Sequence, residues 1–176
     1  RGRAFFLIMV ELIKLVQDIP LEQRERFFAE IRSKNKTGGI LLNTCNRVEW
    51  YSGYGNVSGE VANHLFRVVS GLESTIIGET AIVNQVKTAY LEAAKDSSLD
   101  KGLHKLFQTA FYVGKRVRHE TGISRGAMSH SQAAVNLLFQ QIDSPEKLNI
   151  TVIGVNALNE KIIRFLVNKG AKNIFI

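Results

Sequence analysis

Hydrophobic residues open the chain and then give way to a mixed, helix-like pattern. The run AFFLIMVELIKLV at residues 4–16 is apolar at most positions, and its periodicity fits a buried strand as well as a short helix. Pro20 suits the first turn of a helix, and residues 21–33 after it carry apolar side chains on one side. We therefore expect a strand or a short helix, followed by an amphipathic helix.

Two short apolar segments come next, joined by a polar turn. The residues ILL at 40–42 read as one strand, and VEWYSGY at 48–54, rich in β-branched and aromatic residues, reads as a second. The TCN residues at 44–46 form a plausible turn, because asparagine tolerates unusual backbone angles. Cys45 then lies at a strand-to-strand connection, where a reactive group can face a cleft.

Four helical patterns follow in the middle of the chain. Apolar residues recur at helical spacing over residues 61–70, 79–95, 102–119 and 129–142. Ser144-Pro145 then marks a boundary. We expect these helices to cover the small sheet that the earlier strands form.

The pattern changes again beyond Asn149. ITVIG at residues 150–154 is a short strand that ends in glycine, residues 156–170 read as a helix, and NIFI at 173–176 opens another strand. This order is one β-α-β unit, the first half of a nucleotide-binding sheet. One such unit cannot complete a doubly wound fold, so we expect the remainder of that domain to lie outside this chain.

These patterns predict an α/β protein in three parts. The first, residues 1–125, is an α+β domain with a small sheet flanked by helices. Residues 126–146 form a connecting helix and linker, and residues 147–176 form a partial Rossmann-like domain.

Composition narrows the class of protein. The chain has 176 residues, of which 45% are hydrophobic and 22% charged, as in an ordinary folded globular protein. Its single cysteine excludes an internal disulfide and fits a reducing, cytoplasmic location. No apolar run reaches the roughly 18–20 residues that a membrane span needs.

The net charge of +7 is unevenly distributed. Between residues 101 and 125, one acid, Glu120, accompanies six basic residues: Lys101, Lys105, Lys115, Arg116, Arg118 and Arg125. Such a segment attracts phosphate backbones, although a solvated helix face has the same composition. Charge alone leaves both interpretations open.

Cys45 is the first candidate for chemistry. A thiol becomes a useful nucleophile when its pKa falls and its sulfur is accessible. Arg47 is positioned to lower that pKa or to hold a substrate carboxylate in a bidentate grip, and Thr44 and Asn46 add hydrogen-bonding groups. The alternative is a small buried hydrophobic residue.

Other polar residues offer weaker signals. His64 suits a general base or proton donor, but also a surface or satisfied interior histidine. Glu79 and Gln85 lie six residues apart and either project toward one cleft or form a helix start and a polar face. No cluster has metal-ligand spacing, so we predict no metal site. The turn that begins at Gly154 has Asn156 where the dinucleotide fingerprint has a glycine, so it fits a phosphate turn or an ordinary connection.

Taken in order, the motifs are more specific than any one of them. LLNTCNRVEWY, HLFRVVSGLESTIIGETAIVNQVKTAY, LFQTAFYVGKRVRHETGIS, SHSQAAVNLL and VIGVNALNEKIIRFLVNKGAKNIFI follow one another along the chain. Together they resemble the glutamyl-tRNA reductase family over about residues 38–176. The TCNR block and the HLFR, GLES, GE and QVK series carry the resemblance.

The resemblance implies an NADPH-dependent oxidoreductase that opens the five-carbon route to tetrapyrroles such as porphyrins and heme. Cys45 would attack the ester between glutamate and tRNA, release the tRNA and keep the glutamyl group as a thioester. NADPH would then reduce the thioester to glutamate-1-semialdehyde. Arg47 would recognise the glutamate side-chain carboxylate, and His64 would hydrogen-bond near the reacting ester.

By the same resemblance, two further sets of residues bind substrate and cofactor. The substrate set is Thr44, Asn46, Arg47, Ser74, Glu79, Thr80, Ala81 and Gln85. The cofactor set, at the NADPH phosphates, is Gly154, Val155, Asn156, Ala157, Leu158 and Asn159. The partner is glutamyl-tRNA, whose acceptor arm is a candidate ligand of the basic helix at 101–118. The family also implies a homodimer formed through a later C-terminal domain.

Several departures from the family pattern bear on these expectations. Thr80-Ala81 replace a common Pro-Gln pair, residues 1–37 lack the usual opening motif, and the connection from the second strand to HLFR is short. We expect this chain alone to form the thioester with little NADPH oxidation. Two alternatives are a non-catalytic tRNA- or RNA-binding module and an unrelated Rossmann-type dehydrogenase.

Overall fold

The computed structural model divides the protein into two compact units, Arg1–Arg125 and Gly126–Ile176. The boundary between them follows the basic helix. The residues that the structure describes are 9–16, 20–34, 38–44, 46–126, 128–142 and 144–176.

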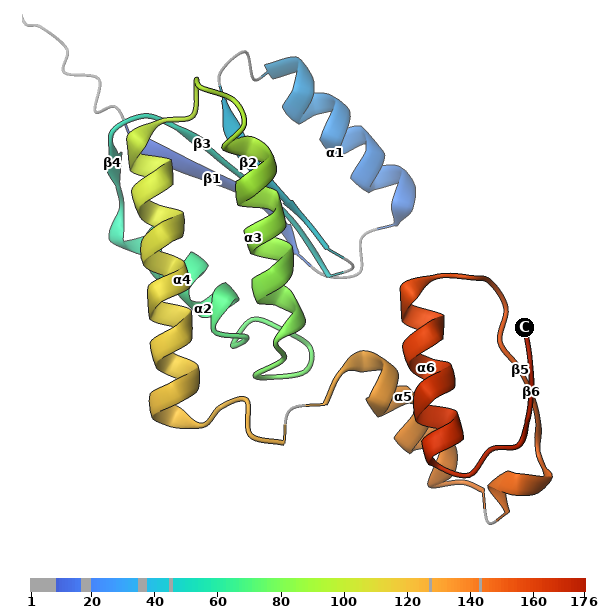
Figure 1. Cartoon of the computed structure of the whole chain (residues 1–176). Helices are drawn as coiled ribbons and strands as arrows, with labels where there is room; N and C mark the ends of the chain where they lie inside the picture. The colour runs from blue at the N-terminus through green and yellow to red at the C-terminus, as the bar shows by residue number, and fades with distance from the viewer. Residues whose placement is uncertain (1–8, 17–19, 35–37, 45, 127, 143) are drawn as a thin grey trace, which may run out of the picture. The chain divides into compact units, whose positions relative to one another are not determined.

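The first unit is built on a four-stranded sheet in the order β2-β3-β1-β4 (Figure 1). The strands are β1 (Met9–Val16), β2 (Gly39–Asn43), β3 (Arg47–Gly53) and β4 (Asn56–Val57). β1 and β2 pair antiparallel to β3, and the short β4 pairs parallel to β1. The opening apolar run, which fitted a strand or a helix, is therefore a strand over its described part.

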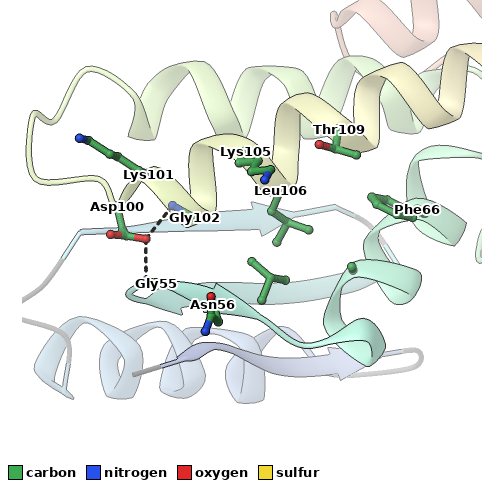
Figure 2. A pocket seen from close by; sticks show the side chains of 11 residues that line it. Gly55, Asn56, Phe66, Asp100, Lys101, Gly102, Lys105, Leu106 and Thr109 are labelled. Carbon is green, nitrogen blue, oxygen red and sulfur yellow. Dashed lines mark hydrogen bonds between the residues drawn. The ribbon is translucent and has the colours of Figure 1, made fainter. Parts of the chain in front are cut away.

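Helices enclose this sheet on both faces. They are α1 (Leu21–Lys34), α2 (Gly59–Val69), α3 (Ala81–Ala93) and α4 (Lys101–Thr121). α1 lies on one side of the sheet, and α3 and α4 lie on the other in both views (Figures 1 and 2). The apolar faces of α2, α3 and α4 meet the sheet in one core, which includes Ile40, Tyr51, Leu65, Val86 and Phe107.

Local signals fix where these helices begin and end. The Ser58 side chain accepts a hydrogen bond from the Val61 amide at the start of α2, and Asp100 does the same for Gly102 at the start of α4. α4 ends at Gly122, whose φ of 65° is the left-handed conformation that glycine adopts at low cost.

The second unit contains the predicted β-α-β element. Strands β5 (Asn149–Thr151) and β6 (Asn173–Phe175) pair in parallel, and α6 (Ala157–Asn168) connects them. α5 (His130–Phe139) packs on α6, and their shared core includes Val135 from α5 and Leu166 from α6. A short 3₁₀ turn, η1 (Pro145–Lys147), precedes β5.

The predicted α/β class is confirmed, because helices and small sheets make up both units. The helix that the sequence suggested as a connector packs within the second unit. It ends at Phe139 rather than near residue 142. No described helix combines the length and the apolarity that a membrane crossing requires.

Candidate functional site

The TCNR segment forms a tight turn between β2 and β3. The Thr44 amide donates to the Arg47 carbonyl at 2.9 Å, and the amides of Asn46 and Arg47 both donate to the Thr44 hydroxyl at 3.2 Å. Arg24 on α1 donates to the Thr44 carbonyl at 2.7 Å. Thr44 therefore organises the turn, while Cys45 itself lies outside the described residues.

A buried carboxylate, Glu49, lies two residues beyond Arg47 on the same face of β3. Its Oε1 is 3.3 Å from Arg47 Nη1 and 2.9 Å from His64 Nε2, and its Oε2 accepts a 2.6 Å hydrogen bond from the Tyr51 hydroxyl. The alternation of a strand places residues 47, 49 and 51 on one face, and α2 brings His64 to it. The Glu49 side chain is 0% exposed, so its charge depends entirely on these partners.

The electrostatics of this network favour an ionised Glu49. Burial by itself raises the pKa of the Glu49 carboxyl, but hydrogen bonds with His64 and Tyr51 and the charges of His64 and Arg47 outweigh it, so the pKa is lowered overall. Burial, together with the Glu49 charge, raises the pKa of Tyr51. Tyr51 is therefore a permanent donor and Glu49 a permanent acceptor near neutral pH.

The connection between α2 and α3 contains GLES at residues 71–74 and is here called the GLES loop. It is tied to the same network. Arg47 Nη2 donates to the Glu73 carbonyl, and Arg67 Nε donates to Glu73 Oε1 at 2.5 Å. The hydrogen bond from Arg67 lowers the pKa of Glu73. One residue beyond Ser74, the hydroxyl of Thr75 accepts a 2.9 Å hydrogen bond from Asn46 Nδ2. The loop that carries Ser74 is thus held against the TCNR turn.

The remaining substrate candidates lie at the start of α3. Glu79 is 8% exposed and precedes the helix, Thr80 is its N-cap residue, and Ala81 is its first residue. Gln85 is exposed in the second turn. It lines a cavity of about 360 Å³, here called the β2–α3 cavity, together with Leu41, Asn43, Asn84, Thr88 and Ala89.

The structure therefore brings some predicted residues together and separates others. Thr44, Asn46, Arg47 and His64 form one hydrogen-bonded group with the GLES loop. Gln85 lies in the neighbouring β2–α3 cavity instead. Arg47 is only 2% exposed, because Glu49 and the Glu73 carbonyl already hold its guanidinium.

Sequence reasoning missed four residues of this network: Glu49, Tyr51, Arg67 and Glu73. The strand pattern of VEWY contained one signal, since alternation puts Glu49 beside Arg47. Its partner His64 lies 15 residues further along the chain, on α2, and no local pattern indicates this contact.

The predicted cofactor turn lies in the second unit. Gly154 has a φ of 98°, and a Cβ built there would lie 3.6 Å from Asn159 Nδ2, an ordinary van der Waals contact, so the positive φ is what favours glycine at this position. Asn156 Oδ1 caps α6 by accepting from the amides of Leu158 and Asn159 at 3.0 and 2.9 Å. The turn fits a phosphate, provided that the Asn156 side chain moves aside and gives up these two donors.

A second cavity, of about 590 Å³, lies between β4, α2 and the start of α4 (Figure 2). Asp100 Oδ1 shapes it by accepting from the amides of Gly55 and Gly102 at 2.9 and 2.7 Å. Lys101 and Lys105 line it, but none of the predicted site residues does.

The basic helix α4 offers fewer cationic groups to a phosphate ligand than its sequence suggested. Arg118 donates to the Val69 carbonyl at 2.6 Å, and partial burial lowers its pKa. Arg116 pairs with Glu120 at 2.7 Å. Lys101, Lys105 and Lys115 are exposed. Among the described residues, histidines and carboxylates do not gather into any group of three that could hold a metal ion.

Comparison with known proteins identifies the family. The model of the family "Glutamyl-tRNAGlu reductase, N-terminal domain" matches residues 13–121. The chain belongs to this family. The resemblance that the TCNR and HLFR motifs carried is therefore confirmed.

Individual relatives agree with this assignment. A glutamyl-tRNA reductase from Methanopyrus kandleri is 36% identical over 163 residues, covering 83% of this chain and 40% of the relative. One from Pelotomaculum thermopropionicum is 36% identical over 169 residues, covering 79% and 38%. The solved structure of glutamyl-tRNA reductase from Methanopyrus kandleri aligns with a TM-score of 0.60 and 31% identity, covering 94% of this chain and 48% of that one. The chain thus spans less than half the length of these relatives.

Proposed function

We propose that this chain supplies the glutamyl-tRNA-binding and thioester-forming part of an NADPH-dependent glutamyl-tRNA reductase in tetrapyrrole biosynthesis, acting in the cytosol. The observation that carries the proposal is the buried Glu49 carboxylate, which joins Arg47 of the TCNR turn to His64 of the HLFR helix. A fold needs no such network for stability, because apolar residues of similar volume stabilise a core at least as well.

His64 is the proposed general base. Because the Glu49 carboxylate accepts from Nε2–H, a neutral His64 ring keeps its lone pair on Nδ1. The Cys45 thiol gives its proton to Nδ1, and the thiolate attacks the ester carbonyl of glutamyl-tRNA. The carbon–oxygen ester bond then breaks, and the ribose oxygen leaves with the proton from His64. A thiol and an oxygen ester are consumed, and a thioester and a ribose hydroxyl are formed.

Arg47 is the proposed partner of the glutamate side-chain carboxylate. A guanidinium has five N–H donors, and the contacts with Glu49 and the Glu73 carbonyl account for two of them. These contacts fix the plane of the guanidinium and leave the side chain 3% exposed, so a carboxylate would reach its other donors when the loop that carries Glu73 moves aside. The Arg67–Glu73 pair holds the GLES loop, whose Ser74 completes the proposed substrate contacts.

NADPH, when bound, supplies the hydride that converts the thioester to the aldehyde. Gly154 and the first turn of α6 up to Asn159 would hold its phosphates. We expect the cap that Asn156 forms to weaken this binding, because the phosphates and the Asn156 side chain compete for the same amides.

Intact-mass measurement after mixing with glutamyl-tRNA tests the proposal. The expected result is one added glutamyl group on the wild-type chain and none on Cys45→Ser, with equal tRNA affinity for both. Tight tRNA binding by the wild type without any adduct would instead favour a non-catalytic RNA-binding module. The exposed Lys101, Lys105 and Lys115 on α4 would suit such a module.

A further inference from the structure

The β2–α3 cavity differs in chemistry from the buried ion network. Two of its lining residues, Leu41 and Ala89, are apolar. The other four, Asn43, Asn84, Gln85 and Thr88, present three amides and one hydroxyl. None of these six carries a charge, although the cavity of about 360 Å³ is large enough for a small ligand.

This lining selects the class of ligand. A carboxylate or a phosphate there would meet no cationic group from the lining, and desolvating an anion without one is costly. A nucleobase has the complementary properties, because its faces are apolar and its edges carry donors and acceptors. Side-chain amides of Asn and Gln pair with the edge of adenine, where one donor and one acceptor lie side by side.

The position of the cavity relative to the reacting cysteine adds a second argument. Asn43 is the last residue of β2 and lies two residues before Cys45. Since consecutive Cα atoms are 3.8 Å apart, the two Cα atoms are separated by at most about 7.6 Å. In an aminoacyl-tRNA, the ester and the terminal adenine are attached to the same ribose. A nucleophile that reaches the ester therefore has the adenine close to it.

The sheet edge offers further groups to such a ligand. β2 is the outermost strand of the four-stranded sheet on this side of the described fold. An edge strand presents backbone N–H and C=O groups that are not used within the sheet. The cavity itself is lined by β2 residues, Leu41 and Asn43, on one side and by α3 residues on the other.

We propose that the β2–α3 cavity binds the 3′-terminal adenine of the aminoacyl-tRNA, with the amides of Asn43 and Asn84 pairing with the edge of the base. This inference rests on the proposed function, because it takes the ester of glutamyl-tRNA as the group that Cys45 attacks.

Two synthetic esters test the proposal. One carries glutamate on the 3′-oxygen of adenosine, and the other carries it on the 3′-oxygen of 1-O-methylribose, which has the same leaving oxygen but no base. The rate of glutamyl addition to Cys45 is followed by intact mass. We expect the wild type to react roughly tenfold faster with the adenosine ester at equal, low concentration.

Variants of the lining sharpen the test. Asn84→Ala and Asn43→Ala should each slow glutamyl addition from the adenosine ester about fivefold to tenfold. The rate with the ester that lacks a base should not change. Asn84→Ala is expected to fold, because alanine favours a helix more than asparagine does. Asn63→Ala, at an exposed position on α2, is the matched control and should leave both rates unchanged.

The outcomes separate this inference from the proposed function. Equal wild-type rates for the two esters would show that the cavity does not bind the base. A parallel loss of both rates in Asn84→Ala would show that the cavity serves the part that the two esters share. Either result would overturn the inference. If neither ester nor glutamyl-tRNA forms an adduct, the proposed function fails. Binding of free adenosine, measured by ligand-observed NMR, then decides the inference alone. Equal affinity in wild type and Asn84→Ala would overturn it.

Discussion

Nε2 of His64 lies 2.9 Å from Oε1 of Glu49, and the Glu49 side chain is completely buried. The same oxygen is 3.3 Å from Arg47 Nη1. One carboxylate therefore orients both a candidate base and a candidate carboxylate-binding group. This arrangement couples the stability of the first unit to the proposed chemistry.

Glu49→Gln keeps the shape of the side chain but removes its charge, and we expect it to destabilise the first unit. Arg47 would be left buried without its anion, and breaking a buried pair in this way costs about 3 kcal/mol. The free energy of unfolding in urea at pH 7 measures the loss. Glu120→Gln, which breaks an exposed pair with Arg116, is the control and should unfold as the wild type does.

The pH dependence of stability should reveal the same carboxylate. The pKa of Glu49 in the folded state lies below its ordinary value of 4.5, so its contribution is fully present above pH 4.5 and is lost as the pH falls through the lowered value. The difference in unfolding free energy between wild type and Glu49→Gln should therefore shrink below pH 4.5. A difference that stays constant from pH 7 to pH 3 would show that folding does not lower the pKa of Glu49.

Much of the fold could be predicted because its signals are local. Helical spacing predicted α4 to within two residues at either end, and the β-α-β unit followed from a glycine after one strand and a helix before the next. The opening run could not be decided in this way. Its identity as a strand depends on pairing with β3, in which Val10 lies opposite Gly53.

The candidate site was predictable only as a set of motifs. TCNR and HLFR identified the family, but neither motif indicates that its residues meet at a third residue, Glu49. Sequence statistics argue against a fully buried glutamate unless it is paired, and its partners come from separate elements. The same limit applies to Arg118, whose sequence context suggested a solvent-exposed charge and whose side chain is partly buried.

His64→Gln is expected to remove the base while keeping a hydrogen-bonding side chain. General base catalysis typically contributes about a hundredfold or more, so glutamyl addition to Cys45 should slow by at least that factor. The affinity for tRNA should not change. His119→Gln on the exposed surface of α4 is the control. Full activity of His64→Gln would exclude the general-base role.

Asn156 should stabilise the second unit and oppose phosphate binding at the same time. Asn156→Ala removes an N-cap that satisfies two amides, which costs about 1 kcal/mol. Asn156→Asp keeps the cap and adds a negative charge at the start of α6, so the stability should be retained. Thermal unfolding of the three proteins compares them. Equal loss of stability in both variants would show that the cap is not the cause.

Gly78 should be the position where the GLES loop tolerates substitution least. Its φ is 80°, and a Cβ there would lie 2.2 Å from the Ile123 carbonyl oxygen, so alanine is opposed by both the backbone conformation and the contact. Gly126 provides a matched control, because its φ is 76° and a Cβ would meet nothing within 4 Å.

Gly126→Ala should cost only about 1 kcal/mol, the penalty for a left-handed alanine. Gly78→Ala should cost more, and it should also slow glutamyl addition because Ser74 and Glu79 flank the displaced backbone. Urea unfolding and adduct formation measure the two effects. If both variants lose the same stability, the approach of Gly78 to Ile123 does not constrain the loop, and its order must come from the contacts of Glu73 with Arg47 and Arg67.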